Sequence, residues 1–358
     1  MKKVLVVAAE DSASFHASRL LEKLRGLGDF SFFGVGTRSL LDEHMDVVYD
    51  SSELSFVGLE EPAKLFKIMK IYSSLKGFAK EADGLLLIDY PGMNLRLARY
   101  AKRCGKPVCY YVAPQVWAWW RSRVKAVRAS VDRLVCLFPF EVDFFRNYGV
   151  SARFFGHPLV NLLEGYKGES RDCIVFLPGS RESEFSRLFP VMLEASVKLK
   201  RLFPERRLAF IRAPGIPRER FGSLFPWIEL VEPDERFEVM GKALGAVSAS
   251  GTATLELAVL EVPTVVVYRT SRLTFELGRR LVKVNNLSMV NILAQREVFP
   301  ELLQERLQAE RVVDWMRLFV VDYNLRRNIL KAVRKVVEDL KGDNPYMKAA
   351  EFFCEVLC

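Results

Sequence analysis

Short, almost continuously apolar runs alternate with amphipathic stretches along this chain. Apolar runs such as Lys3–Ala9 and Gly84–Asp89 are typical of strands buried on both faces of a parallel sheet. The stretches between them repeat apolar residues every three or four positions, which predicts helices. In the first half we expect further strands at Ser31–Val35, Val108–Ala113, Arg133–Leu137 and Arg153–Phe155, and helices at Ala13–Leu27, Pro62–Lys80, Asn94–Arg103 and Glu141–Tyr148.

The same alternation resumes after a polar, glycine-bearing stretch, Glu164–Arg171. Strands are expected at Cys173–Leu177, Leu208–Ile211, Ile228–Val231, Ala246–Ala249 and Thr264–Tyr268, and only helical patterns remain after about Leu302. Strands that alternate with helices predict α/β architecture. We expect two Rossmann-like domains facing across a cleft, at residues 1–166 and 167–320, with C-terminal helices at 321–358 that pack back on the first domain.

Composition narrows the class of protein. The chain has 358 residues, of which 50% are hydrophobic, so it can bury two large cores and is not disordered. The six cysteines have no CxxC spacing and only three histidines accompany them, so we expect no metal site and no cofactor. The N-terminal apolar run Val4–Ala9 is short and is followed by two acids, which predicts a buried strand and not a signal peptide. The scattered cysteines are typical of free thiols in a cytoplasmic protein. No apolar run approaches the roughly 18 residues of a membrane span, so no transmembrane segment is expected.

Two Gly/Ser/Thr turns in the second half each connect a strand to a helix. One is Pro178–Glu184, with Gly179, Ser180 and Arg181, and the other is Ser248–Glu256. Such turns direct backbone N–H groups at an anion, and an arginine can pair with a phosphate. The second turn contributes Ser250, Gly251 and Thr252, and Glu256 follows one helical turn later, where its carboxylate could accept ribose hydroxyls. Either turn could equally be an ordinary helix cap.

Carboxylates follow two strands of the first half. Asp89 ends the strand before Pro91, and ligands of open α/β sheets bind at the carboxyl ends of strands. Asp89 is therefore a candidate general base. Glu10, Asp11 and Ser12 close the first strand, where they cap a helix or line an acceptor site.

Basic residues and tryptophans are interleaved at Ala113–Arg128, which contains Trp117 and Trp119. The pattern fits a membrane interface, single-stranded nucleic acid or the edge of a core. The helix Pro62–Lys80, with Ile68, Met69 and Tyr72 on a wide apolar arc and lysines around it, favours a membrane surface. The RNP and KH patterns of RNA-binding modules are absent, so no nucleic acid partner is expected.

Taken together, these motifs resemble the lipid A disaccharide synthases over nearly the whole chain. The segments that carry the resemblance are AEDSAS, IDYPGMN, YYVAPQVWAWW, CLFPFE, FFGHPL, LPGSRESE, ASGTATLE, VVVYR and LSMVNILAQREVFPELLQ, in that order. The resemblance implies an inverting, metal-independent glycosyltransferase of the GT-B type. Its substrates would be UDP-2,3-diacylglucosamine and 2,3-diacylglucosamine 1-phosphate, joined by a β-1,6 bond with release of UDP. It also implies peripheral attachment to the cytoplasmic face of the inner membrane of a Gram-negative-type bacterium.

The resemblance also assigns residues. The family's essential strand-end aspartate falls on Asp89, and its nucleotide contacts fall on Ser180, Arg181, Ser250, Gly251, Thr252 and Glu256, with Asn291 nearby. The family's first turn usually reads GE-x-SGD, whereas this chain has Ala13 and Ser14 at the glycine and aspartate positions. A second acid common in the aspartate motif is Gly92 here. These departures place more weight on Asp89, Glu10 and Asp11.

Three alternatives stay open at this point. Two are other two-domain UDP-sugar enzymes, the UDP-N-acetylglucosamine 2-epimerase and the peptidoglycan N-acetylglucosaminyltransferase. They should lack the Trp-rich basic segment and the wide apolar helix. The third is a non-catalytic protein that binds membrane surfaces and has kept the fold.

Overall fold

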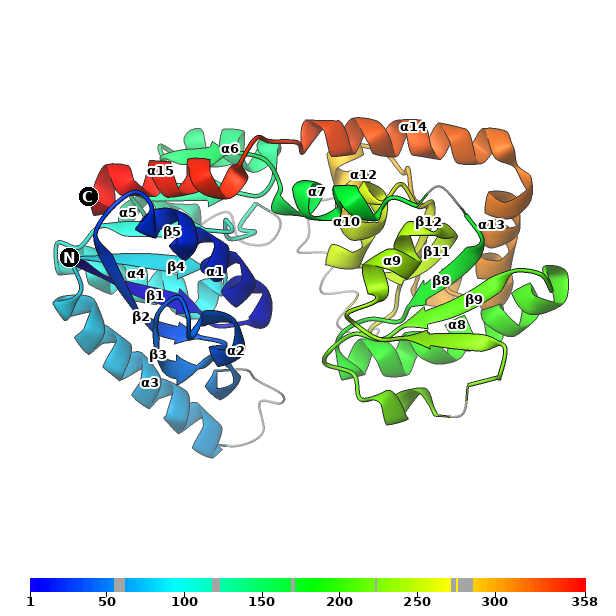
Figure 1. The fold of residues 1–358 in the computed structure, drawn as a ribbon, viewed down its shortest axis with the longest axis horizontal. Coiled ribbons are helices and arrows are strands. Elements are labelled where there is room, and N and C mark those ends of the chain that lie inside the picture. Colours follow the sequence, from blue (N-terminus) through cyan, green and yellow to red (C-terminus); the bar gives the residue numbers. More distant parts are fainter. Residues whose placement is uncertain (55–61, 118–122, 169–170, 223, 272–274, 276–285) are drawn as a thin grey trace. The chain divides into compact units, whose positions relative to one another are not determined.

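The computed structural model describes residues 1–54, 62–117, 123–168, 171–222, 224–271, 275 and 286–358, with residues 62–67 described by their backbone alone. The chain forms two compact units, Met1–Pro158 with Gly342–Cys358, and Leu159–Lys341. These bounds differ from the expected 166/167 and 320/321. Each unit is a parallel sheet with helices around it (Figure 1).

The first unit contains a seven-stranded parallel sheet in the order β3-β2-β1-β4-β5-β6-β7. Its strands are β1 Lys2–Ala8, β2 Phe30–Gly36, β3 Asp46–Asp50, β4 Gly84–Ile88, β5 Val108–Tyr111, β6 Arg133–Cys136 and β7 Ala152–Phe154. Its helices are α1 Asp11–Arg25, α2 Arg38–Leu41, α3 Pro62–Glu81, α4 Pro91–Arg103, α5 Val124–Ser130, α6 Pro139–Arg146 and α15 Pro345–Leu357. The strand β3 was not predicted from the sequence.

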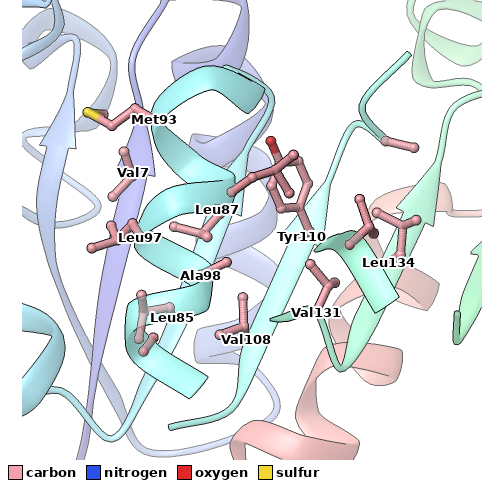
Figure 2. Close-up of a cluster of buried hydrophobic side chains, with 14 of the residues drawn as sticks. Val7, Leu85, Leu87, Met93, Leu97, Ala98, Val108, Tyr110, Val131 and Leu134 are labelled. Carbon is pink, nitrogen blue, oxygen red and sulfur yellow. The ribbon is translucent and has the colours of Figure 1, made fainter. Parts of the chain in front are cut away.

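Alternate residues of β1 and β4 enter two separate cores, one on each face of this sheet. Figure 2 shows the first core, in which Leu97 and Ala98 of α4 lie against strand residues such as Leu87. The second core includes Leu20 and Leu21 of α1 together with Phe353 of α15. Because both faces are covered, β4 is apolar along its whole length and β1 is apolar from Val4 onward.

The second unit contains a six-stranded parallel sheet in the order β10-β9-β8-β11-β12-β13. Its strands are β8 Cys173–Leu177, β9 Arg207–Ile211, β10 Ile228–Val231, β11 Ala243–Ala249, β12 Thr264–Tyr268 and β13 Glu301–Leu303, of which β13 was not predicted. Its helices include α7 Pro158–Leu163, α8 Glu182–Leu202, α9 Arg236–Gly241, α10 Thr252–Val259, α12 Met289–Ala294, α13 Ala309–Val321 and α14 Tyr323–Asp339.

The C-terminal helices divide between the two units. The buried side of α14, with Ile329 and Val333, packs on α10, α12 and α13, so this helix belongs to the second unit. The helix α15 alone packs on the first unit, against α1. The chain re-enters the first unit at Gly342, where an added Cβ would lie only 2.5 Å from Cα of Gly156. Glycine is therefore required for this close approach.

Both sheets change direction once in their strand order. The switch points lie between β1 and β4 in the first unit and between β8 and β11 in the second. Ligands of open α/β sheets bind beyond the carboxyl ends of the strands at such points. A ligand site is therefore expected at these two edges.

Candidate functional site

Asp89 lies at the switch point of the first unit, directly after β4. Asp89 and Tyr90 both have left-handed backbone conformations, with φ of 49° and 46°. This conformation is uncommon for residues other than glycine and persists only where the surroundings enforce it. The backbone N–H of Asp89 donates to the carbonyl of Tyr111 at 3.0 Å, and its carbonyl accepts bonds from Tyr110 Oη and from Asn94 Nδ2, the latter at 2.9 Å. The strained turn is thus fixed by neighbouring elements.

The electrostatics of this edge favour a proton-accepting aspartate. Burial, and then the negative charge of Glu10, raise the pKa of Asp89. Burial and Glu10 also raise the pKa of the neighbouring Tyr90. A carboxylate with a raised pKa is a stronger base than an exposed one. The structure therefore brings the predicted residues Glu10 and Asp89 together.

Asp11 belongs to a hydrogen-bond network at the same edge. Its Oδ1 accepts a bond from Thr37 Oγ1 at 2.7 Å, and Thr37 also contacts Ser51 at 2.7 Å. Ser14, which stands at the family's aspartate position, accepts a bond from the backbone N–H of Thr37 at 2.9 Å. The network joins the carboxyl ends of β1, β2 and β3. Ser12 is exposed on the first turn of α1.

The predicted membrane-facing residues are only partly exposed. Met69 is 63% exposed, whereas Ile68 and Tyr72 pack against the core of the first unit. Trp117 is buried, and its Nε1 donates to Glu141 Oε1 at 2.9 Å. This geometry argues against an interfacial role for Trp117, which is buried, whereas Ile68 and Tyr72 are partly buried and keep some exposed surface. Trp119 lies outside the described residues.

Glu141 is a residue of this edge that sequence reasoning missed. It is 2% exposed, and Oε2 accepts bonds from the backbone N–H groups of Leu137 and Phe138, each at 3.2 Å. Burial raises its pKa to about 7, and the charge of Asp89 contributes in the same direction. The signal in the sequence is a glutamate at the third position of a helix that begins with Pro139, which is a capping pattern.

The first anion turn of the second unit lies at the carboxyl end of β8. Gly179 has φ of +106°, and a Cβ added to it would lie 3.0 Å from Glu184 and 3.6 Å from Cβ of Ala249 in β11. Ser180 is exposed. The Arg181 side chain is 80% exposed, and its Nη1 lies 3.3 Å from Glu184 Oε1. The acids Glu182 and Glu184 already occupy the first turn of α8, where they compete with an anion.

The second anion turn, at the end of β11, lacks such acids. The first turn of α10 contains no acidic residue, and its cap residue Gly251 has no side chain to satisfy the free N–H groups. Nothing lies within 4 Å of a Cβ added to Gly251, and Thr252 is exposed beside it. Ser250 Oγ lies 3.5 Å from the carbonyl of Leu287. Of the two helix N-termini, that of α10 is therefore better suited to bind a diphosphate.

Glu256 lies on the same helix, one turn further on. Its side chain is 12% exposed, with Oε1 at 3.8 Å from Arg236 Nη2. Burial raises the pKa of Glu256, and the charge of Arg236 opposes this shift. A partly exposed carboxylate near the helix N-terminus retains free acceptor capacity for hydroxyl groups.

Comparison with known sequences identifies the family. The sequence profile described as lipid-A-disaccharide synthetase matches residues 4–352. The chain is 38% identical over 375 aligned positions to the lipid-A-disaccharide synthase of Myxococcus xanthus, with 99% of this chain and 97% of that protein covered.

This chain belongs to the lipid-A-disaccharide synthetase family. The resemblance inferred from the motifs is thus confirmed, and so is the α/β architecture with a helical C-terminal region. Two solved structures share the fold over 99% of both chains. The kitacinnamycin glycosyltransferase has a TM-score of 0.66 at 14% identity, and the UDP-N-acetylglucosamine 2-epimerase of Neisseria meningitidis has 0.64 at 13%. At these identities the likeness concerns the fold alone.

Asn291, which the resemblance placed near the nucleotide contacts, lies in the interior of the second unit. It is fully buried, and its side chain bonds the backbone of Val298 and Phe299 and Oε1 of Glu301, at 2.7–2.9 Å. These bonds use both amide hydrogens and both carbonyl lone pairs. This geometry argues against a direct nucleotide contact for Asn291. Glu301 also accepts bonds from the backbone N–H of Leu287 and Ser288, so both residues position the start of α12.

No group of three or more His, Cys, Asp or Glu residues in the described part of the chain could hold a metal ion. Among the described helices, none combines the length and apolar character that crossing a bilayer requires.

Proposed function

We propose that this protein joins UDP-2,3-diacylglucosamine to 2,3-diacylglucosamine 1-phosphate and releases UDP. The observation that carries the proposal is the family match over residues 4–352, together with the location of Asp89 at the switch point of the first sheet. The two other UDP-sugar enzymes are not favoured, because the relatives with high coverage are lipid-A-disaccharide synthases.

In the proposed reaction, Asp89 orients the acceptor 6-hydroxyl and accepts its proton. The acceptor oxygen forms a bond with the anomeric carbon of the donor sugar, while the bond from that carbon to the diphosphate oxygen breaks. Attack opposite the leaving group inverts the anomeric centre and gives the β-1,6 linkage. The raised pKa of Asp89 supports this role, since an ordinary aspartate is a weak base at neutral pH.

The second unit is proposed to bind the UDP moiety. The free N–H groups of α10 at Gly251 and Thr252 would stabilise the charge that grows on the diphosphate. Arg181 is exposed and can exchange its contact with Glu184 for a phosphate. Gly179 and Ser180 would line the same site, and Glu256 would accept ribose hydroxyls.

The enzyme is further proposed to act peripherally on the inner face of the inner membrane. Both substrates carry acyl chains, and exposing a buried CH₂ group to water costs about 0.8 kcal/mol. The exposed Met69 and the adjacent exposed Lys70 on α3 support a surface contact, since an apolar residue with a neighbouring cation is typical of helices that lie on anionic membranes.

A UDP-release assay tests the proposal. We expect release with both diacylated substrates, a disaccharide product, and no turnover of unacylated UDP-N-acetylglucosamine. Release or epimerisation with the unacylated donor would favour one of the other UDP-sugar enzymes. If the protein turns over no UDP-sugar, the result would favour a non-catalytic binding protein.

A further inference from the structure

Glu141 lies where two loops of the first unit meet. It is in the first turn of α6, and Oε2 turns back to the N–H groups of Leu137 and Phe138, which follow β6. Its other oxygen accepts the indole N–H of Trp117, which follows β5. One buried carboxyl therefore connects the loops at the carboxyl ends of two neighbouring strands.

The indole of Trp117 is held on a second side. Its ring packs edge-on against Phe140, with centroids 4.8 Å apart and an interplanar angle of 90°. Phe140 in turn stacks with Phe138, whose ring lies beside His157. The hydrogen bond and the aromatic contact together fix both the position and the rotation of the indole.

Glu141 is also electrostatically coupled to the proposed base. The titratable groups that influence Glu141 or respond to it are Asp89, at the end of β4, and Cys136, at the end of β6. The negative charge of Asp89 favours the protonated form of Glu141. The pKa of Asp89 itself is raised by burial and by Glu10, so the influence seen here is that of Asp89 on Glu141.

We propose that Glu141 is a positioning residue for the lipid acceptor. It acts by fixing Trp117, which follows β5, the strand that pairs with β4 next to Asp89. This inference rests on the proposed function and extends it to a residue that binds no substrate itself. A neutral side chain could cap α6 equally well. The bond to Trp117 and the proximity to Asp89 are what distinguish Glu141 from an ordinary capping glutamate.

Two substitutions separate this role from simple stabilisation. Trp117→Phe removes the indole N–H but keeps an aromatic ring against Phe140. Glu141→Gln keeps an acceptor for Trp117 but removes the charge and places an NH₂ group in the neighbourhood of two backbone donors. The matched control is Asp132→Asn, because Asp132 connects Lys102 and the N–H of Val108, at 2.7 and 2.8 Å, at the amino end of the same two strands.

The measurements are steady-state kinetics with each diacylated substrate, calorimetry with UDP, and the pH profile of kcat/KM. We expect both test variants to lower kcat/KM for the acceptor by about tenfold to a hundredfold, the scale of a small misplacement of reacting groups. UDP affinity should stay unchanged. In Glu141→Gln the acidic limb of the profile should stay in place, because a carboxyl group with a pKa of about 7 is already largely uncharged on that limb. Asp132→Asn should change stability alone.

The proposal is overturned if both variants fold and lose stability as Asp132→Asn does, while acceptor kinetics stay at wild-type values. If Glu141→Gln does not fold, Trp117→Phe decides by its acceptor kinetics. If the wild-type protein releases no UDP, the proposed function fails independently. Calorimetry with dispersed 2,3-diacylglucosamine 1-phosphate then tests Glu141, and equal binding by wild type and both variants overturns its role.

Discussion

The two units share a parallel α/β sheet, yet the edges at their switch points carry opposite chemistry. The edge of the first unit gathers carboxyl groups, Glu10, Asp89 and Glu141, and the pKa values of Asp89 and Glu141 are raised. The edge of the second unit has small residues and the unoccupied N–H groups of α10. The same topology thus carries the proposed proton acceptor in one unit and the proposed anion site in the other, since the fold fixes where a ligand binds but the residues there decide which ligand.

The largest effect is expected from removing the base of the first unit. Asp89→Asn keeps the size of the side chain but cannot accept a proton at neutral pH. We expect kcat to fall by about 10² or more, the usual contribution of a general base. UDP affinity should stay at its wild-type value, because the nucleotide is assigned to the second unit. Rapid-quench turnover and calorimetry measure the two quantities, and near-normal turnover would remove Asp89 from the mechanism.

Substitution of Glu10 tests the role of Asp89 by changing its pKa, with a smaller expected effect than substitution of Asp89 itself. Its charge raises the pKa of Asp89, so Glu10→Gln should lower that pKa and move the acidic limb of kcat/KM to lower pH. Asp11→Asn is a matched control, because Asp11 bonds Thr37 and is not among the charges that shift Asp89. A limb that moves equally in both variants would show that the coupling to Glu10 is not specific.

Substitutions in the proposed anion site of the second unit should weaken UDP binding, whereas those at Asp89 should lower turnover. Arg181→Ala should weaken UDP binding by about 1.5–3 kcal/mol, the scale of a hydrogen bond to a charged group. Gly251→Val should obstruct the diphosphate without disturbing the fold, because nothing lies within 4 Å of the first added carbon. Arg187→Ala, at an exposed position further along α8, is the control. Calorimetry with UDP gives the affinities, and unchanged binding in both test variants would leave these turns as ordinary helix caps.

The sequence predicted those features of the two edges that depend on the local pattern of apolar and polar residues. The strands β1, β4, β8 and β11 are apolar runs, and each ends at the residues proposed for the site. The strand β13 escaped prediction because a glutamate leaves only two apolar residues in it, and β3 because aspartates flank a short apolar core. The bond between Trp117 and Glu141 joins residues 24 positions apart, and only the adjacency of β5 and β6 brings them together. Local patterns carry no information on such contacts.

For Asn291, the sequence pattern suggested a ligand contact that the hydrogen bonds of the structure do not favour. An amide near an anion turn is consistent with ligand binding, but the unpredicted strand β13 places Glu301 beside it. The amide is then needed to satisfy the buried carboxylate and the backbone of Val298 and Phe299. The role of a polar side chain therefore depended on an element that the sequence pattern did not show.

The two units should also differ, by a smaller amount, in how their stability depends on pH. All three histidines belong to the first unit, and burial lowers the pKa of His16 to about 4 and that of His157 to about 3. Between these values and the usual 6.5, the unfolded chain binds more protons than the folded one. Stability contributed by the neutral histidines is thus complete above pH 6.5 and is lost as pH falls, by up to about 1.4 kcal/mol per pH unit for each residue.

Urea unfolding at pH 7 and pH 5, followed by hydrogen exchange resolved to individual peptides, checks this expectation. The first unit should lose stability relative to the second as pH falls, and His157→Gln should reduce the difference. The variant His44→Gln serves as control, because His44 is only partly buried. Equal loss of stability in both units would mean that other groups dominate the acid response.

The smallest expected effect concerns the bilayer. Met69→Ser removes an apolar side chain that is 63% exposed, so the fold should keep its stability while binding to vesicles of anionic phospholipid weakens about two- to tenfold. Met93→Ser is unsuitable as a control because Met93 is buried, whereas Leu40→Ser removes an exposed apolar side chain from α2 of the same unit. Salt should weaken the binding of wild type and Met69→Ser alike, since the cations remain. If Met69→Ser and Leu40→Ser bind vesicles as wild type does, α3 is not the membrane contact and the lipid substrates reach Asp89 over another surface.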